Sequence, residues 1–123
     1  MQLSPTPRVL LTGVILELTL ATAIIHLTLG GTLFLLNGIG YLTLGAIYLA
    51  STALPAARPH ALLPKAALAA FASVTIAAYL VTGPYFTLGW VTKGIEIAIV
   101  SLVAADLLMR ADAGRASGRP TRA

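Results

Sequence analysis

Long hydrophobic stretches that charged residues hardly interrupt dominate the chain. Between Arg8 and Arg58 the only charged residue is Glu17, and the stretch from Ala66 to Thr92 contains none. A helix rises about 1.5 Å per residue, so a single helix over the first stretch would far exceed the ~30 Å hydrocarbon core of a bilayer. The first stretch must therefore fold back on itself.

Glycine and proline mark the breaks in the hydrophobic pattern. The pair Gly30-Gly31 is the strongest turn signal in the first stretch. It divides this stretch into two predicted helical spans, near residues 9–28 and 32–53. Residues 54–64 contain three prolines, which cannot continue an α-helix, and we expect a loop there.

The second hydrophobic stretch divides in the same way. Gly83-Pro84 interrupts it, so we predict a third span at about residues 65–82 and a fourth at about 88–109. Four spans with short connections are typical of an up-down helix bundle. The expected fold is an all-α, polytopic membrane protein with a four-helix transmembrane bundle.

Composition excludes a soluble domain. Of the 123 residues, 58% are hydrophobic and only 10% are charged, and the mean hydropathy is +0.91. An average soluble domain has roughly a quarter of its residues charged. A small soluble fold cannot bury this much apolar surface. The chain has no cysteine, which excludes disulfides and thiolate ligands.

The basic residues predict the orientation. With both termini in the cytoplasm, seven of the eight lie on the inner side and only Lys93 lies outside, as the positive-inside rule favours. We therefore expect a multi-pass protein of the inner (plasma) membrane, with a transmembrane domain at 1–110 and a mobile basic tail at 111–123. Beside a hydrophobic span, such a tail indicates lipid headgroups rather than nucleic acid. The seven residues are Arg8, Arg58, Lys65, Arg110, Arg115, Arg119 and Arg122.

Glu17 is an ionisable residue within the first span. Gly13 and Ala21 lie one turn before and after it, and small residues let another helix approach closely. We therefore expect Glu17 to be buried against protein, as a neutral hydrogen-bonded group, a proton-relay carboxylate or a contact with a partner subunit. A different face of the same span carries Thr12, Ile15, Thr19, Thr22 and His26.

Three spans bring polar side chains to one depth, in the outer third of the bilayer. Lys93 and Glu96 are three residues apart and can pair on one helix face. His26, Asn37 and Tyr41 are expected at the same level. This polar cluster is either a hydrogen-bonded plug that fixes helix packing or a ligand site. Tyr79 and Tyr85 are placed to close it.

The sequence gives little support for a metal, haem or catalytic site. Asp106 and Arg110 are four residues apart and predict an ion pair at the inner boundary. His26 is the only histidine within a span, because His60 lies in the predicted loop. A metal site or a self-contained haem site needs more ligands than this, although a haem shared between subunits stays open. We expect no cofactor, no metal and no catalytic set.

Small residues dominate the third span and favour close helix packing, within the bundle or in an oligomer. These residues are Ala66, Ala69, Ala70, Ala72, Ser73, Ala77 and Ala78.

Two segments carry a resemblance to a known group of proteins. One has a His before a Gly turn and continues into Asn37-Gly38-Ile39-Gly40-Tyr41, and the other contains Lys-x-x-Glu in the fourth span. Together they resemble small four-helix bacterial membrane proteins without an assigned function. The resemblance covers most of the chain to about Leu108 and implies no activity.

Two functions remain as expectations. The first is a non-enzymatic accessory or scaffold subunit, part of a homo-oligomer or a larger membrane complex, with Glu17 and the third span as contact faces. The alternative is a binder or carrier of a small molecule, a quinone, a lipid or a proton-coupled ion, which uses the outer polar cluster. An intramembrane enzyme is a third hypothesis.

Overall fold

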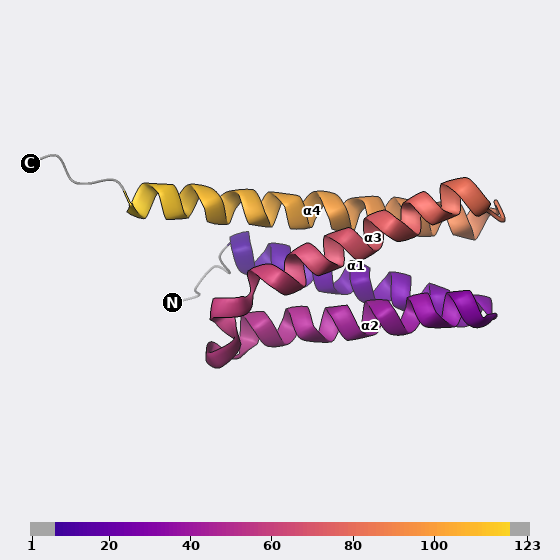
Figure 1. Ribbon diagram of the computed structural model, residues 1–123, viewed down its shortest axis with the longest axis horizontal. Helices are drawn as coiled ribbons and strands as arrows, with labels where there is room; N and C mark the ends of the chain where they lie inside the picture. The colour runs from indigo at the N-terminus through magenta and orange to yellow at the C-terminus, as the bar shows by residue number, and fades with distance from the viewer. Residues whose placement is uncertain (1–6, 119–123) are drawn as a thin grey trace, which may run out of the picture.

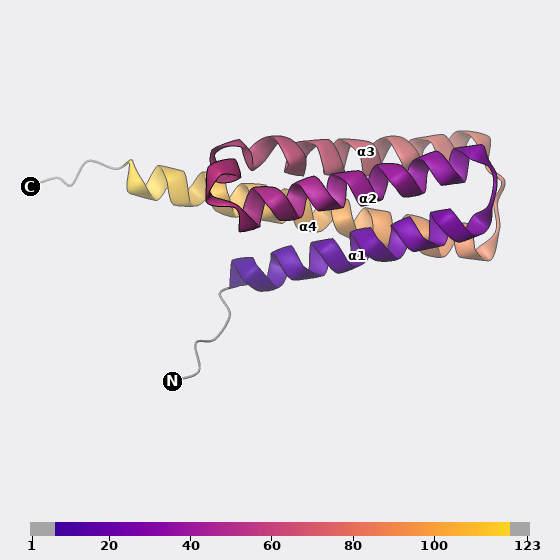
Figure 2. The same ribbon diagram turned by 90° about the horizontal axis from the view of Figure 1, so that it is seen from below.

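The computed structural model describes residues 7–118, and this part of the chain is all-helical, without a strand. Four helices lie side by side (Figures 1 and 2). The connections between α1 and α2 and between α3 and α4 lie at one end, which we call the turn end; the opposite end, near both termini, is the terminal end. The elements are α1 (Pro7–Leu29), α2 (Thr32–Ala53), the 3₁₀ helix η1 (Pro55–His60), α3 (Leu62–Thr82) and α4 (Thr87–Ser117).

Three of these helices are each long and apolar enough to cross a membrane: α1, α2 and α3. The fourth helix, α4, packs beside α1 and α3. Its last turns extend beyond the ends of the other helices (Figures 1 and 2). The chain is therefore a membrane protein by the length and composition of its helices.

Two segments differ from the sequence prediction. The expected loop at 54–64 contains η1, and α3 begins at Leu62, because a proline in the first helical turn removes only an amide that has no intrahelical partner. The fourth helix does not end near Met109 but continues to Ser117, with an Asp112–Arg115 ion pair in its last turns. The first seven residues of the expected tail are thus helical, and residues 119–123 lie outside the described part of the chain.

Glycine makes both tight turns at the turn end possible. Gly30 and Gly31 have φ angles of 73° and 88°, and Gly83, after α3, has a φ angle of 62°. Side chains other than glycine rarely adopt this region of backbone conformation. The predicted breaks at both positions are confirmed.

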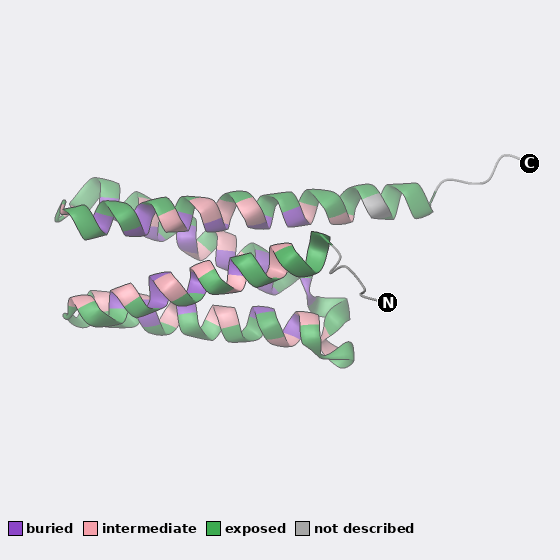
Figure 3. Cartoon of the chain, turned by 180° about the vertical axis from the view of Figure 1, so that it is seen from behind, coloured by how far each residue is buried: buried purple, intermediate pink, exposed green. Residues whose placement is uncertain are grey.

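Apolar side chains cover the outside of the molecule, whereas the faces that meet inside are mixed. Figure 3 shows buried residues along the facing sides of the helices and exposed ones around the outside. The exposed residues include large aliphatic side chains on all four helices, such as Ile24, Leu36, Val81 and Ile97. An apolar exterior is unfavourable in water and suits a hydrocarbon environment.

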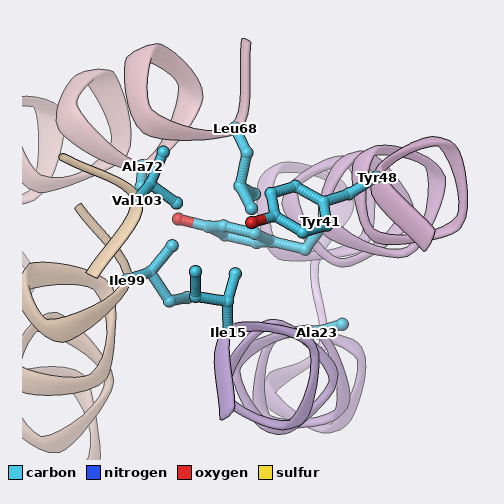
Figure 4. Packing of buried hydrophobic residues seen from close by; sticks show 8 residues of the cluster. All are labelled: Ile15, Ala23, Tyr41, Tyr48, Leu68, Ala72, Ile99 and Val103. Carbon is cyan, nitrogen blue, oxygen red and sulfur yellow. The ribbon is translucent and has the colours of Figure 1, made fainter. Parts of the chain in front are cut away.

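The middle of the interior is an apolar layer. Tyr41 and Tyr48 reach inwards from α2, towards residues of the other three helices (Figure 4). Most of the small residues of α3 do not line this layer, since Ala72 is buried but Ala66, Ala70, Ser73 and Ala77 are exposed. The buried cluster comprises Ile15, Ala23, Tyr41, Tyr48, Leu68, Ala72, Ile99 and Val103.

Candidate functional site

Lys93 and Glu96 form an ion pair in the interior near the turn end. Glu96 is fully buried and Lys93 is only 6% exposed. From α1, the Thr22 hydroxyl donates a hydrogen bond to Oε1 of Glu96 over 3.5 Å. His26 Nε2 lies 3.7 Å from the same oxygen, an ion-pair distance when the imidazole is protonated. The predicted pair is thus part of a network between α1 and α4.

The His26 ring is held in place by its own helix. Its Nδ1 lies 2.8 Å from the backbone oxygen of Thr22, and because a carbonyl only accepts, Nδ1 carries the hydrogen. Nε2 therefore points away from α1 towards Glu96. The ring also lies beside Tyr41, with the centroids 5.6 Å apart.

The network continues to α3. Lys93 Nζ donates to the backbone oxygen of Thr75 over 3.4 Å, and the Thr75 and Tyr41 hydroxyls are 2.9 Å apart. Side chains or backbone of all four helices therefore meet at this depth. Asn37, the remaining member of the predicted cluster, is half-buried, and its side chain has no hydrogen-bond partner within residues 7–118.

A cavity of about 280 Å³ lies against this network at the turn end. Its wall is mainly apolar and aromatic, and it comes from all four helices and the connection before α4. The polar groups at its surface include His26, Asn37, Thr92 and Lys93. Glu96 does not line the cavity and lies behind Lys93. Four residues of the predicted cluster thus lie at or directly behind one cavity, and Tyr41 packs against His26.

Aromatic rings surround one side of the cavity. Tyr79, which lines it, packs edge-on against Trp90 with the centroids 5.3 Å apart. Tyr85 stacks on Trp90 at 5.8 Å and packs edge-on against Tyr79 at 5.5 Å. Tyr79 and Tyr85, which were predicted to close the site, therefore lie beside it, and Trp90, the only tryptophan of the chain, packs against both.

The donors of the site determine what it can bind. A lysine ammonium has three N–H groups, and Lys93 directs two of them to Glu96 and Thr75. The third is left for a group in the cavity, and the Asn37 amide adds two more donors and an acceptor. The charge of Lys93 is balanced by Glu96. The cavity therefore suits a neutral molecule with an apolar body and a hydrogen-bond acceptor.

A second buried ion pair lies near the terminal end. Asp106 on α4 contacts Lys65 on α3, and both side chains are fully buried. The Tyr48 hydroxyl accepts a hydrogen bond from Lys65 over 2.9 Å and donates one to Oδ2 of Asp106 over 3.1 Å. Arg110 Nε lies 3.5 Å from Oδ1 of Asp106. The predicted Asp106–Arg110 contact is thus present, but Lys65 is the nearer partner of Asp106.

Glu17 is not buried within this chain, contrary to the prediction. Its side chain is exposed on the outer face of α1, and no ion pair involves it within the described residues. A Cβ atom added to Gly13, one turn earlier, would meet nothing within 4 Å. Within residues 7–118 no helix approaches this face, because α1 turns its threonine and histidine face inwards. A contact between Glu17 and a partner subunit remains a prediction.

Several residues of the site had no distinctive signal in the sequence. Thr22 and Thr75 are threonines among many in apolar helices, and Thr92 and Phe71 are equally ordinary there. Lys65 follows a proline at the start of a span, which is typical of a boundary charge. Its partner Asp106 is on another helix, and only packing between helices reveals such a pair.

Residues 7–118 contain no group of three or more His, Asp or Glu side chains placed to hold a metal ion. In comparisons with known proteins, no family model, no curated protein and no solved structure matches the chain.

Proposed function

We propose that the protein is a four-span protein of the plasma membrane with both termini in the cytoplasm. The arrangement of three apolar helices beside α4 supports this topology. The basic residues support the orientation, because Arg8, Arg58, Lys65, Arg110 and Arg115 all belong to the terminal end. The turn end, with its aromatic rings and the cavity, then faces the outer leaflet, where tyrosine and tryptophan are favoured.

We further propose that the protein is a non-enzymatic binder of a small amphipathic molecule, a quinone or a lipid. The observation that carries this proposal is the cavity against the Lys93–Glu96 network. Ligand pockets are typically apolar with a few convergent polar groups, and this one has that character. The apolar part of the ligand would contact Phe34, Phe71 and Val74, while its carbonyl would accept a hydrogen bond from Lys93.

A cavity-blocking variant tests the proposal. Ala78 is an exposed residue at the wall of the cavity, whereas its exposed neighbour Ala77 does not line it. A benzoquinone with a decyl chain, bound in the cavity of the purified protein, should quench Trp90 fluorescence saturably. We expect Ala78→Phe to weaken this quenching at least about tenfold, because one hydrogen bond to a charged donor and part of the apolar contact are lost.

Ala77→Phe is the matched control. In this variant the quinone should quench Trp90 fluorescence as it does in the unchanged protein. Quinone dissolved in the micelle quenches without saturation and affects all variants equally. Equal, unsaturable quenching of the unchanged protein and both variants contradicts quinone binding in this cavity.

A second function, that of a subunit in a membrane assembly, is favoured by the exposure of Glu17. This carboxylate lies near the middle of α1, on a face that packs against no other helix of the chain. A charged side chain that faces lipid at this depth is unfavourable by about 2.5–3.5 kcal/mol or more. A helix of another subunit with a hydrogen-bond donor would remove this cost, and Gly13 leaves room for it.

Native mass spectrometry of the protein after gentle extraction tests this second function. We expect an assembly larger than one chain, and we expect Glu17→Leu to reduce it to the single chain. Thr43→Leu is the control, since Thr43 is exposed on α2 and its substitution should leave the assembly intact. A single chain without any protein partner before substitution would refute the proposal.

A further inference from the structure

A second cavity, of about 480 Å³, opens at the terminal end. Its wall includes three arginines, and each comes from a different element: Arg8 from α1, Arg58 from η1 and Arg110 from α4. These residues are far apart in the sequence, so the fold brings them together. The positive-inside rule accounts for arginines on one side of a membrane but does not require them to surround one cavity.

Positive charge is in excess around this cavity. Within residues 7–118 no acidic side chain lines the cavity, and Asp106, which lies beside Arg110, already contacts the buried Lys65. The wall thus carries three arginines, and the carboxylate beside Arg110 is shared with Lys65. The other three acidic residues of the chain are elsewhere: Glu96 with Lys93, Glu17 on the outer face of α1, and Asp112 with Arg115.

The excess positive charge favours the entry of an anion. Cations that share one cavity repel each other, although solvent screens part of the repulsion here because Arg8 and Arg58 are exposed and Arg110 is half-buried. Arg110 also has a buried Nε that donates no hydrogen bond within the described part of the chain, although it is 3.5 Å from Asp106. A buried donor without an acceptor costs free energy. Oδ1 of Asp106 likewise has no hydrogen-bond partner and lies opposite this Nε, so an anion in the cavity would act by reducing the repulsion between the arginines.

The remaining groups of the cavity fit a phosphate. Guanidinium groups present forks of N–H donors that match phosphate oxygens. Thr12 adds a hydroxyl group to the wall, whereas the Ser51 and Thr52 hydroxyls, also at the wall, already donate to the backbone oxygens of Tyr48 and Leu49. The first turn of α1, with Arg8 and Val9, also lines it, and the amides of a first turn have no partner within the helix.

We propose that the terminal-end cavity binds a phosphate group, carried either by an anionic lipid or by free phosphate. The site differs from the turn-end cavity in its chemistry, because there Glu96 balances Lys93 and here the arginines are in excess. It does not depend on the ligand proposed for the turn end. The three arginines hold the anion, and the Lys65–Asp106 pair lies beside Arg110 without lining the cavity.

Two probes and a matched pair of variants test the proposal. The full chain is placed in nanodiscs of phosphatidylcholine with a minority of phosphatidylglycerol, and native mass spectrometry counts the phosphatidylglycerol that stays bound. Inorganic phosphate is titrated calorimetrically into the protein in a neutral detergent, at constant ionic strength. Arg58→Gln removes a charge from the cavity, whereas Arg115→Gln removes one near the same end but outside the cavity wall.

We expect Arg58→Gln to weaken binding about tenfold, because one charge-assisted contact to phosphate is lost, and Arg115→Gln to have little effect. Arg8→Gln should repeat the result of Arg58→Gln. Retention of phosphatidylglycerol alone identifies a lipid headgroup, and a calorimetric signal from phosphate alone identifies a free anion. The proposal is overturned if neither probe binds, or if Arg58→Gln and Arg115→Gln weaken binding equally.

Discussion

Replacement of Lys65 by methionine is expected to lower the free energy of unfolding by about 3–5 kcal/mol. The substitution keeps the volume of the side chain but leaves the fully buried Asp106 with Tyr48 and the more distant Arg110. Loss of one partner from a buried ion pair leaves an uncompensated charge, which is the source of this cost. Unfolding in mixed micelles with a rising fraction of sodium dodecyl sulfate, followed by Trp90 fluorescence and circular dichroism, measures it.

Two controls distinguish the effect of breaking the buried ion pair from a general effect of removing a charge. The double variant Lys65→Met/Asp106→Leu should be close to the unchanged protein in stability, since apolar residues often replace a buried pair at no net cost. Asp112→Asn breaks the exposed pair with Arg115 and should change little. If Lys65→Met alone is as stable as the unchanged protein, the Lys65–Asp106 contact does not stabilise the fold.

The second large effect is expected at the turn end. The double variant Lys93→Met/Glu96→Met should abolish saturable quenching of Trp90 by the decyl benzoquinone, because the donor proposed for the carbonyl is gone. The free energy of unfolding should remain within about 2 kcal/mol, because both members of the buried pair are replaced by apolar residues of similar length. Quinone titration and micellar unfolding of the same preparation measure both quantities.

This variant also distinguishes a ligand site from a structural plug. A plug would lose stability without any change in quinone quenching. Lys65→Met/Asp106→Leu is the matched control, because it exchanges the same kind of pair between buried positions that do not line the turn-end cavity. Quenching should persist in the control. If Lys93→Met/Glu96→Met binds quinone as the unchanged protein does, Lys93 is not the donor.

The helices were largely predictable because composition and turn residues act locally. Gly30-Gly31 and Gly83-Pro84 marked both breaks, and the bounds of α2 agree with the prediction. The end of α4 was harder, since Arg115 and Asp112 pair along the helix and favour its continuation beyond Met109. Polar and small residues alone do not define where a helix leaves the bilayer.

Only two features of the sequence predicted the site: the expected depth of each residue in the bilayer and the helical periodicity. Depth brought His26, Asn37, Lys93 and Glu96 to one level, and periodicity paired the last two. Neither rule identifies which face of a helix meets its neighbours. On α1 the small residues around Glu17 favoured the face of Glu17, whereas the structure has the face of His26 inside. In lipid there is no hydrophobic force between helices, and hydrogen bonds and packing select the face.

The apolar layer of Figure 4 has an electrical consequence. Ile15, Leu68, Ile99 and Val103 separate the Lys93 and Lys65 networks, and no hydrogen bond or ion pair connects the two anywhere in residues 7–118. Across a membrane, such a layer has a low dielectric constant and opposes the movement of charge. A proton driven against the field from one network to the other would require about 2.3 kcal/mol per 100 mV. The apolar layer is therefore an electrostatic barrier to charge movement between the two networks.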